Sequence, residues 1–220
     1  MVFSISFLHE LRQYELELVA RLLPPGARVL EVGAGTGYQA RELQSRGFNV
    51  AAIDVHQSNY SEERVFPVID YDGKTFPVAD RSVDVVFSSN VLEHILDLDT
   101  FHRETRRVLK PDGYCIHLMP TGAWRFWTTL AGWADILPAI CPQLRGLLPW
   151  PLDRATSRRM AGAGIQLMRT VGGRAIPTRH GERGTALTEL WTFSRPHWVR
   201  HFSEKGFEII AATPTGLFYT

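Results

Sequence analysis

The sequence predicts an α/β fold with a mostly parallel sheet, and three observations carry this prediction. Short apolar runs that suit buried strands alternate with amphipathic helical segments at the distances of βαβ units. The first run ends in a glycine-rich turn at residues 33–37, which leads into a helical segment. The second run, residues 49–54, ends in an acid, Asp54. Because the carboxyl ends of parallel strands share one edge of a sheet, we expect the turn and the acid to form one site.

Each expected element has a local reason. Residues 9–23 carry apolar side chains at helical spacing and stop at Pro24-Pro25-Gly26, so they predict a helix that covers the sheet. A second helix follows the glycine turn over residues 38–46, and residues 98–109, apolar on one face, predict a crossover helix. The parallel strands are expected at residues 29–32, 49–54, 65–70, 83–89 and 114–119. Residues 207–213 and 216–219 are expected as a final antiparallel pair, and an end at Thr220 suggests a truncated C-terminus.

Length and composition suit one such domain over residues 1–220. The chain has 220 residues, 45% of them hydrophobic and 21% charged, which is ordinary for a soluble globular protein. Its formal net charge is only +1 and no nucleic-acid-binding motif is present, so a nucleic acid is not an expected partner. Cys115 and Cys141 have no metal-type spacing, and the N-terminus does not read as a signal peptide. These features favour reduced thiols and a cytoplasmic location.

The glycine spacing distinguishes between classes of nucleoside ligand. The turn reads G-x-G-x-G, with Glu31 two residues before Gly33, whereas dinucleotide sites carry G-x-G-x-x-G. A carboxylate at Glu31 would be a poor neighbour for a pyrophosphate, and a good one for a ligand with an amino group and a sulfonium. Asp54 can accept hydrogen bonds from both hydroxyls of a ribose. The pattern therefore predicts a nucleoside cofactor other than a dinucleotide.

Four segments between residues 28 and 120 resemble, in the same order, the class I S-adenosylmethionine-dependent methyltransferases of the small-molecule and quinone-pathway branch. They are the glycine turn, residues 72–87 with an acid and an Asp-x-Ser-hydrophobic-Asp pattern, residues 88–95 with Leu-Glu-His, and residues 109–114, similar to the family's "LKPGG" turn. Residues 194–220 match only loosely. The resemblance implies a Rossmann-like, seven-stranded, mostly parallel sheet with helices on both faces, and S-adenosylmethionine as the cofactor.

The resemblance also implies roles for individual residues. Glu31 would lie near the amino group of the cofactor and Asp54 at its ribose. Asp72 and Gly73 would flank the adenine, with Asp70 as an alternative, and Ser89 and Asn90 would face the methyl group. No metal is expected, because Asn90 stands where some relatives place the first of two metal-binding glutamates. The cofactor-binding residues expected on this basis are Glu31, Gly33, Ala34, Gly35, Gly37, Asp54, Val55, Asp72, Gly73, Ser89 and Asn90.

A hydroxyl acceptor would also need a general base, and two histidines are candidates. His94, in Leu92-Glu93-His94, is expected close to the site, although many relatives carry a packing histidine there. His180 lies in a glycine- and arginine-rich stretch that could close over an acceptor, although an exposed loop histidine is an equally simple interpretation. His117, on the expected fifth strand, is interpreted as a core residue.

Residues 121–193 depart from the alternating pattern and are expected to form a helical and loop cap inserted after the fifth strand. Four of the six tryptophans fall between residues 120 and 152, where charges are few. Between Arg154 and Arg183 there are seven arginines and one acid, Glu182, which with six glycines suggests a lid that binds a carboxylate or phosphate. Packing within its own domain, an apolar acceptor pocket and a peripheral membrane patch all remain open. A membrane span is disfavoured because charges and prolines interrupt the apolar stretches.

Three functions follow from these observations, in order of support. The first is methyl transfer, most simply O-methylation, from S-adenosylmethionine to a small, hydrophobic or anionic acceptor. Acceptors of this kind are an amphipathic metabolite, a sugar or polysaccharide precursor, a lipid-linked intermediate and a quinone precursor. The second is a non-catalytic protein that retains the fold and binds the cofactor or a partner. The third, a nicotinamide-dependent oxidoreductase, is disfavoured by the glycine spacing. The sequence does not predict the oligomeric state.

Overall fold

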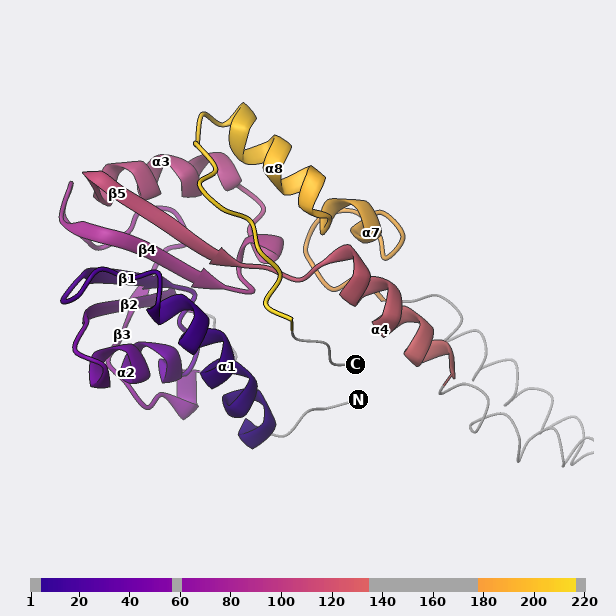
Figure 1. Ribbon diagram of the computed structural model, residues 1–220, viewed down its shortest axis with the longest axis horizontal. Coiled ribbons are helices and arrows are strands. Elements are labelled where there is room, and N and C mark those ends of the chain that lie inside the picture. Colours follow the sequence, from indigo (N-terminus) through magenta and orange to yellow (C-terminus); the bar gives the residue numbers. More distant parts are fainter. Residues whose placement is uncertain (1–4, 57–60, 135–177, 217–220) are drawn as a thin grey trace, which may run out of the picture. The chain divides into compact units, whose positions relative to one another are not determined.

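The computed structural model describes residues 5–56, 61–134 and 178–216 (Figure 1). These residues fall into two compact units, each of which is described by itself. The first contains the chain up to Met119 together with Thr213–Gly216, and the second runs from Pro120 to Ala212. The expected cap, residues 121–193, is described only at its two ends, and its central part lies outside the described residues.

The first unit is a parallel sheet with helices on both faces. Its strands are β1 (Arg28–Val32), β2 (Asn49–Val55), β3 (Val68–Tyr71), β4 (Val83–Ser89) and β5 (Leu109–Leu118). Its helices are α1 (Ile5–Ala20), α2 (Tyr38–Ser45) and α3 (Leu98–Val108), with the short 3₁₀ turns η1 (Ser61–Glu63) and η2 (Leu92–His94). The strand order is β3-β2-β1-β4-β5, and all four pairings are parallel. The α/β fold expected from the sequence is therefore confirmed.

The seven-stranded sheet expected from the resemblance is wrong for the described residues, where the sheet has five strands. Residues 207–216 form no strand, and residues 217–220 lie outside the described part of the chain. Two features explain why 207–216 does not pair. Pro214 has no N–H to donate to a ladder, and Gly206 and Gly216, which bound the segment, both have left-handed backbone angles, φ 77° and 75°.

The two faces of the sheet bury different side chains because residues alternate along each strand. On one face, Val29, Val50 and Val85 pack with Leu16 of α1 and Leu43 of α2. Val86 and Leu30, in adjacent positions of β4 and β1, point to the other face and are fully buried. Helix α3 covers that second face, where Phe101 lies 5.9 Å from the ring of His117 on β5. The central position of β1 therefore places its carboxyl end within the protein rather than at an exposed edge strand.

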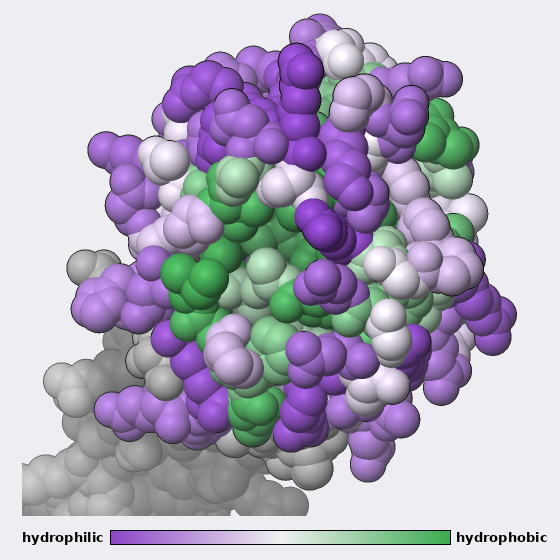
Figure 2. All heavy atoms as spheres, turned by 90° about the vertical axis from the view of Figure 1, so that its left-hand side faces the viewer, coloured by the Kyte–Doolittle hydropathy of each residue, from purple (hydrophilic) through white to green (hydrophobic). Residues whose placement is uncertain are grey.

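One face of the molecule is shown in Figure 2. This face is largely purple, with apolar side chains gathered in a green area at its middle. Among the described helices, none is long and apolar enough to cross a membrane.

The second unit contains α4 (Gly122–Ala134), α7 (Glu189–Thr192) and α8 (Arg195–Glu204). Helix α8 begins at Arg195, because the Ser194 side chain accepts a hydrogen bond from the His197 N–H and Pro196 stands in the first turn. Helix α4 contacts α7 through its N-terminal part, where the N–H of Gly122 donates to the Phe193 carbonyl at 3.1 Å. Helix α4 lies within residues 121–193, and the cap expected there stays a prediction.

Candidate functional site

The glycine turn after β1 adopts backbone angles that other residues resist. Gly33, Gly35 and Gly37 all have positive φ, at 73°, 55° and 74°. A Cβ on Gly33 would lie 2.4 Å from Cγ2 of Val91, and a Cβ on Gly37 would lie 2.7 Å from Cβ of Phe66. Glycine is therefore required at these two positions for packing as well as for backbone angle. The turn keeps bare backbone at the carboxyl edge of the sheet.

Asp54, at the end of β2, is bound directly to this turn. Its Oδ2 accepts a hydrogen bond from the Gly35 N–H and its Oδ1 accepts one from the Val55 N–H, both at 2.8 Å. The residue is 8% exposed. Because each carboxylate oxygen has two lone pairs, both oxygens can accept a second hydrogen bond, such as one from a ribose hydroxyl. The sequence argument that the turn and the acid share a site is supported by these two contacts.

Glu31 is the most perturbed acid at this edge. It lies on β1 and is 1% exposed, and its Oε2 has no hydrogen-bond partner among the described residues. Burial raises the pKa of Glu31 to about 8, against smaller lowerings by a hydrogen bond from the Ala40 backbone and then by the cation of Arg12. A buried carboxyl group with an unused oxygen suits a ligand that brings its own cation or N–H donors.

Ser89 and Asn90 end β4 beside the turn. Asn90 has φ 55°, a left-handed angle that asparagine tolerates better than most residues, and its N–H donates to the Leu118 carbonyl at 2.9 Å. Ser89 is bound by a residue that the sequence interpretation missed, Arg12 of α1, whose Nη1 donates to Ser89 Oγ at 2.9 Å. The only signal in the sequence was a cation within an apolar helix, which is too common to identify a site.

The end of β3 contributes Asp72 and Gly73. Gly73 has φ 75°, and a Cβ on it would lie 3.6 Å from Cγ1 of Val55, so the ends of β2 and β3 are neighbours here. Asp72 is exposed, and its Oδ1 accepts hydrogen bonds from the N–H groups of Lys74 and Thr75, both at 2.8 Å, which lower the pKa of its carboxyl group.

Asp70, the alternative to Asp72, already has partners of its own. Arg64 Nη2 lies 2.5 Å from its Oδ1, and His56 Nδ1 lies 3.3 Å from its Oδ2. The hydrogen bond from Arg64, followed by that from His56, lowers the pKa of Asp70. These contacts favour the Asp72–Gly73 turn over Asp70 as the part of β3 open to a ligand.

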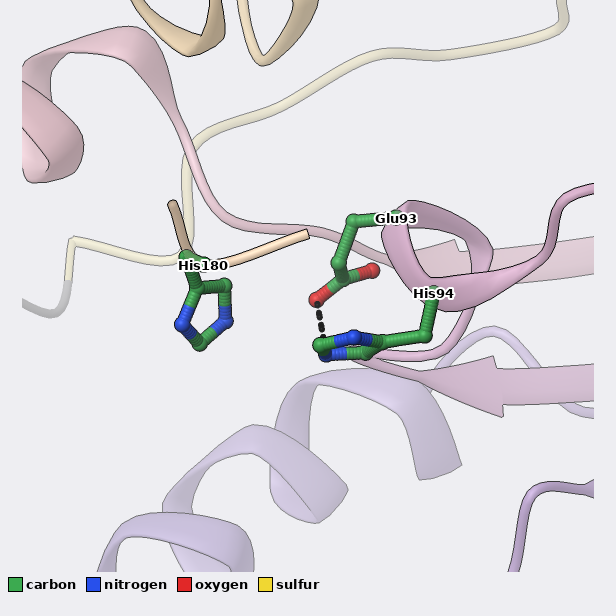
Figure 3. Close-up of side chains that lie close together, drawn as sticks. All are labelled: Glu93, His94 and His180. Atoms are coloured by element: carbon green, nitrogen blue, oxygen red, sulfur yellow. Dashed lines mark ion pairs between the residues drawn. The ribbon is translucent and has the colours of Figure 1, made fainter. Parts of the chain in front are cut away.

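His94, one of the two candidate bases, follows the end of β4 on η2. Figure 3 shows its ring beside the carboxylate of Glu93, with Nε2 3.9 Å from Glu93 Oε1. The Glu93 side chain is fully buried, whereas that of His94 is 42% exposed. An imidazole next to a buried carboxylate can hold and release a proton, so the position is suited to a general base.

His180, the other candidate, belongs to the second unit. Its N–H and that of Gly181 donate to Oε1 of the buried Glu189, at 2.7 and 2.8 Å. Its ring meets that of Trp124 edge-on, with 4.9 Å between centroids. His180 is thus held by a packed turn within the second unit.

A buried ion pair that sequence reasoning also missed organises this turn. Arg125 Nε lies 2.9 Å from Glu189 Oε2, with side-chain exposures of 6% and 0%. Arg125 Nη2 donates to the carbonyl of Thr178 at 2.5 Å, and Glu189 Oε1 accepts hydrogen bonds from the N–H groups of His180 and Gly181. In the sequence, Arg125 and Glu189 are 64 positions apart with the expected lid between them, so no local pattern joins them.

Two further titratable groups lie within the first unit. Burial lowers the pKa of His117 to about 3, and its Nδ1 lies 2.8 Å from Ser88 Oγ, consistent with a neutral core histidine. Burial raises the pKa of the free thiol of Cys115 to about 12, so this thiol is unreactive near neutral pH. Cys141 and the arginines and glycines between residues 154 and 174 lie outside the described residues.

Comparison with known proteins gives one family match. Residues 30–117 match a family described as "Methyltransferase domain". Three similar curated proteins are a demethylmenaquinone methyltransferase of Corynebacterium efficiens, a malonyl-[acyl-carrier protein] O-methyltransferase of Xylella fastidiosa and the biotin biosynthesis bifunctional protein BioHC of Cellvibrio japonicus.

Their identities with this chain are 39%, 37% and 34%, over 41%, 48% and 39% of its length. The matches span only 40%, 39% and 18% of the relatives' own lengths. A solved structure of a SAM dependent methyltransferase from Aquifex aeolicus is 26% identical over 55% of this chain and 75% of its own, with a TM-score of 0.45. The family match covers residues 30–117, the segment that holds the turn, Asp54 and Glu93-His94.

Proposed function

We propose that this chain is a class I S-adenosylmethionine-dependent methyltransferase, which transfers a methyl group from S-adenosylmethionine to a small-molecule acceptor. The match of residues 30–117 to a methyltransferase domain family and the similarity to curated methyltransferases support this proposal. The observation that carries the proposal is the edge formed by Glu31, the glycine turn and Asp54. The buried Glu31 oxygen without a hydrogen-bond partner among the described residues fits a cationic ligand, and Asp54 fits a ribose.

The bound cofactor would supply an already activated methyl group on its sulfonium. The protein then has mainly to orient the acceptor in line with the methyl–sulfur bond, and such positioning is worth roughly 7–11 kcal/mol in effective concentration. Glu31 would hold the amino group, Asp54 the ribose, and the Asp72–Gly73 turn the adenine. Ser89 and Asn90 would border the methyl group at the end of β4.

The acceptor is proposed to be hydrophobic or anionic, and O-methylation is the simplest reaction. The similarity to enzymes named for a quinone precursor and for a malonyl group on a carrier protein supports acceptors of this kind. An alcohol or acid acceptor would lose a proton to His94, or to His180 of the second unit. The apolar and arginine-rich composition of residues 120–183 supports an acceptor-binding cap or a peripheral membrane contact.

The test is a screen of candidate acceptors with cofactor carrying a labelled methyl group, read by mass spectrometry. The panel should contain phenolic quinone precursors, acyl-carrier-bound carboxylates, sugars and lipid-linked intermediates. Transfer of the label to one class names the acceptor. The alternative function, a non-catalytic protein that retained the fold, predicts cofactor binding with no labelled product from any member.

A further inference from the structure

The side chain of Arg12 lies where the helix before the sheet meets the proposed methyl-transfer site. It projects from α1 and is 23% exposed. Its Nη1 contacts Glu15 Oε2 at 2.6 Å on its own helix and Ser89 Oγ at 2.9 Å at the end of β4. With the Asn90 amide turned so that its oxygen faces α1, Asn90 Oδ1 accepts from Nη1 at 2.5 Å and from Nη2 at 3.1 Å. One guanidinium thus joins α1 to Ser89, the last residue of β4, and to Asn90, the residue after it.

These contacts stabilise an unfavourable backbone conformation at Asn90. Asn90 has a left-handed backbone angle, φ 55°, which costs free energy and persists only where its surroundings fix it. The Leu118 carbonyl fixes its N–H, and Arg12 fixes its side chain. An arginine serves here better than a lysine, because the planar guanidinium donates to two acceptors in one fixed geometry.

The same cation acts on the buried carboxyl group of the site. The charges that face Glu31 are Arg12 from α1 and Asp54 from β2, and Arg12 itself is paired with Glu15. Burial favours the protonated form of Glu31 and Arg12 favours the ionised form. A ligand with an ammonium group needs the ionised form, so Arg12 favours cofactor binding through charge as well as through geometry.

We infer that Arg12 is a positioning residue for methyl transfer, which fixes Ser89 and Asn90 beside the methyl group. The inference rests on the proposed function and assigns part of it to α1. An ion pair with Glu15 alone would be an ordinary helix-surface contact of small effect. The contacts to β4, which lies 77 positions away in the chain, are what make α1 part of the site.

The experiment measures the dissociation constants of S-adenosylmethionine and S-adenosylhomocysteine by calorimetry from pH 6 to 9.5. The variants are Arg12→Met, Arg12→Lys and Asn90→Ala, with the double variant Arg12→Met/Asn90→Ala. Arg21→Met is the matched control, because Arg21 is exposed directly after the same helix. Circular dichroism checks that each variant is folded, and Arg12→Lys keeps the test valid if Arg12→Met does not fold.

Arg12→Met should weaken S-adenosylmethionine binding about tenfold at pH 7, the loss of one charge-assisted hydrogen-bond pair. It should also move the pH midpoint of binding upward, because Glu31 then loses its cation. The amine of the ligand titrates equally in every variant, so the difference between variants reports Glu31. Arg12→Lys should keep the wild-type pH midpoint of binding and lose affinity for S-adenosylmethionine. In the double variant, the fold-loss of affinity should be smaller than the product of the fold-losses in the two single variants. Arg21→Met should match wild type.

Wild-type affinity and midpoint in Arg12→Met would overturn the inference while leaving the proposed function standing, since Arg12 would then be only a partner of Glu15. Equal losses of S-adenosylmethionine affinity in Arg12→Met and Arg21→Met, with no shift in the pH midpoint of binding, would overturn the inference as well. If the wild-type protein binds neither ligand, the proposed function fails and the role of Arg12 fails with it.

Discussion

At the scale of single residues, the site is defined by two carboxyl groups with opposite surroundings. Asp54 accepts hydrogen bonds from two backbone N–H groups and keeps lone pairs for a ligand, whereas burial raises the pKa of Glu31. Asp54 can therefore accept hydrogen bonds from a ribose, and Glu31 becomes an effective anion when a cation arrives. The sequence predicted both residues at the site, but only the structure shows their different hydrogen-bond partners.

Substituting Asp54 tests the ribose contact. Asp54→Ala should weaken S-adenosylmethionine binding by roughly 2–3 kcal/mol, because two charge-assisted hydrogen bonds are lost. It should also lower the free energy of unfolding by roughly 1–3 kcal/mol, since the Gly35 and Val55 N–H groups lose their acceptor. Calorimetry and denaturant unfolding measure the two effects. A folded variant with an unchanged dissociation constant would remove Asp54 from the site.

The raised pKa of Glu31 predicts how the stability of the unligated protein depends on pH. Between the unfolded value of 4.5 and the folded value of about 8, the native state binds more protons than the unfolded state. The contribution of Glu31 to stability is therefore largest below pH 4.5 and is lost as the pH rises toward 8, at up to about 1.4 kcal/mol per pH unit. Denaturant unfolding of the wild-type protein and of Glu31→Gln should show a difference that shifts steadily against the wild type over this range. A pH-independent difference would contradict the raised pKa.

At the scale of elements, the sequence predicted correctly those features that depend on residues close together in the chain. The glycine turn, Asp54 and the helix after the turn follow from backbone sterics and periodicity, and they appear as α2 and the ends of β1 and β2. The final strand pair failed, because pairing depends on partners that periodicity does not reveal. The Arg12–Ser89 and Arg125–Glu189 contacts were not predictable for the same reason, since each joins residues more than 60 positions apart.

The glycine turn allows a matched pair of substitutions. Gly26 and Gly33 have similar angles, φ 69° and 73°, but a Cβ on Gly26 meets nothing within 4 Å, whereas one on Gly33 meets Val91 at 2.4 Å. Gly26→Ala should cost only the backbone strain, roughly 1–2 kcal/mol. Gly33→Ala should cost clearly more and should also weaken cofactor binding, because the turn must shift. Thermal unfolding of both variants measures their loss of stability. Equal losses would show that the Val91 side chain moves aside from the new Cβ with no cost in free energy.

The buried Arg125–Glu189 pair should contribute strongly to the stability of the second unit. Arg125→Ala leaves the Glu189 carboxylate buried without its cation, and should lower the free energy of unfolding by about 3–5 kcal/mol. Tryptophan fluorescence during denaturant unfolding reports the change, because Trp124 and Trp191 lie on α4 and α7. The control is Arg200→Ala, which breaks the exposed pair with Glu204 and should leave stability unchanged. Similar effects from both substitutions would argue against a structural role for the Arg125–Glu189 pair.

At the scale of the whole molecule, the fold and the proposed cofactor could be predicted while the acceptor could not. Cofactor recognition uses a fixed set of groups at the strand ends, so its residues recur as a motif. Acceptor recognition is expected in residues 121–193, where specificity depends on surfaces shaped by loops and by a cap. The described ends of that segment show a helix and a packed turn, and neither encodes an acceptor by its residue pattern.

The central claim, that this edge of the sheet binds S-adenosylmethionine, is tested most directly by titrating the purified protein with S-adenosylmethionine, S-adenosylhomocysteine and NAD in a calorimeter. Glu31 and the G-x-G-x-G turn predict micromolar binding of the first two and no measurable binding of NAD, whose pyrophosphate would meet the carboxyl group of Glu31. Tighter binding of NAD than of S-adenosylmethionine would contradict the assignment of the cofactor and, with it, the proposed methyl transfer.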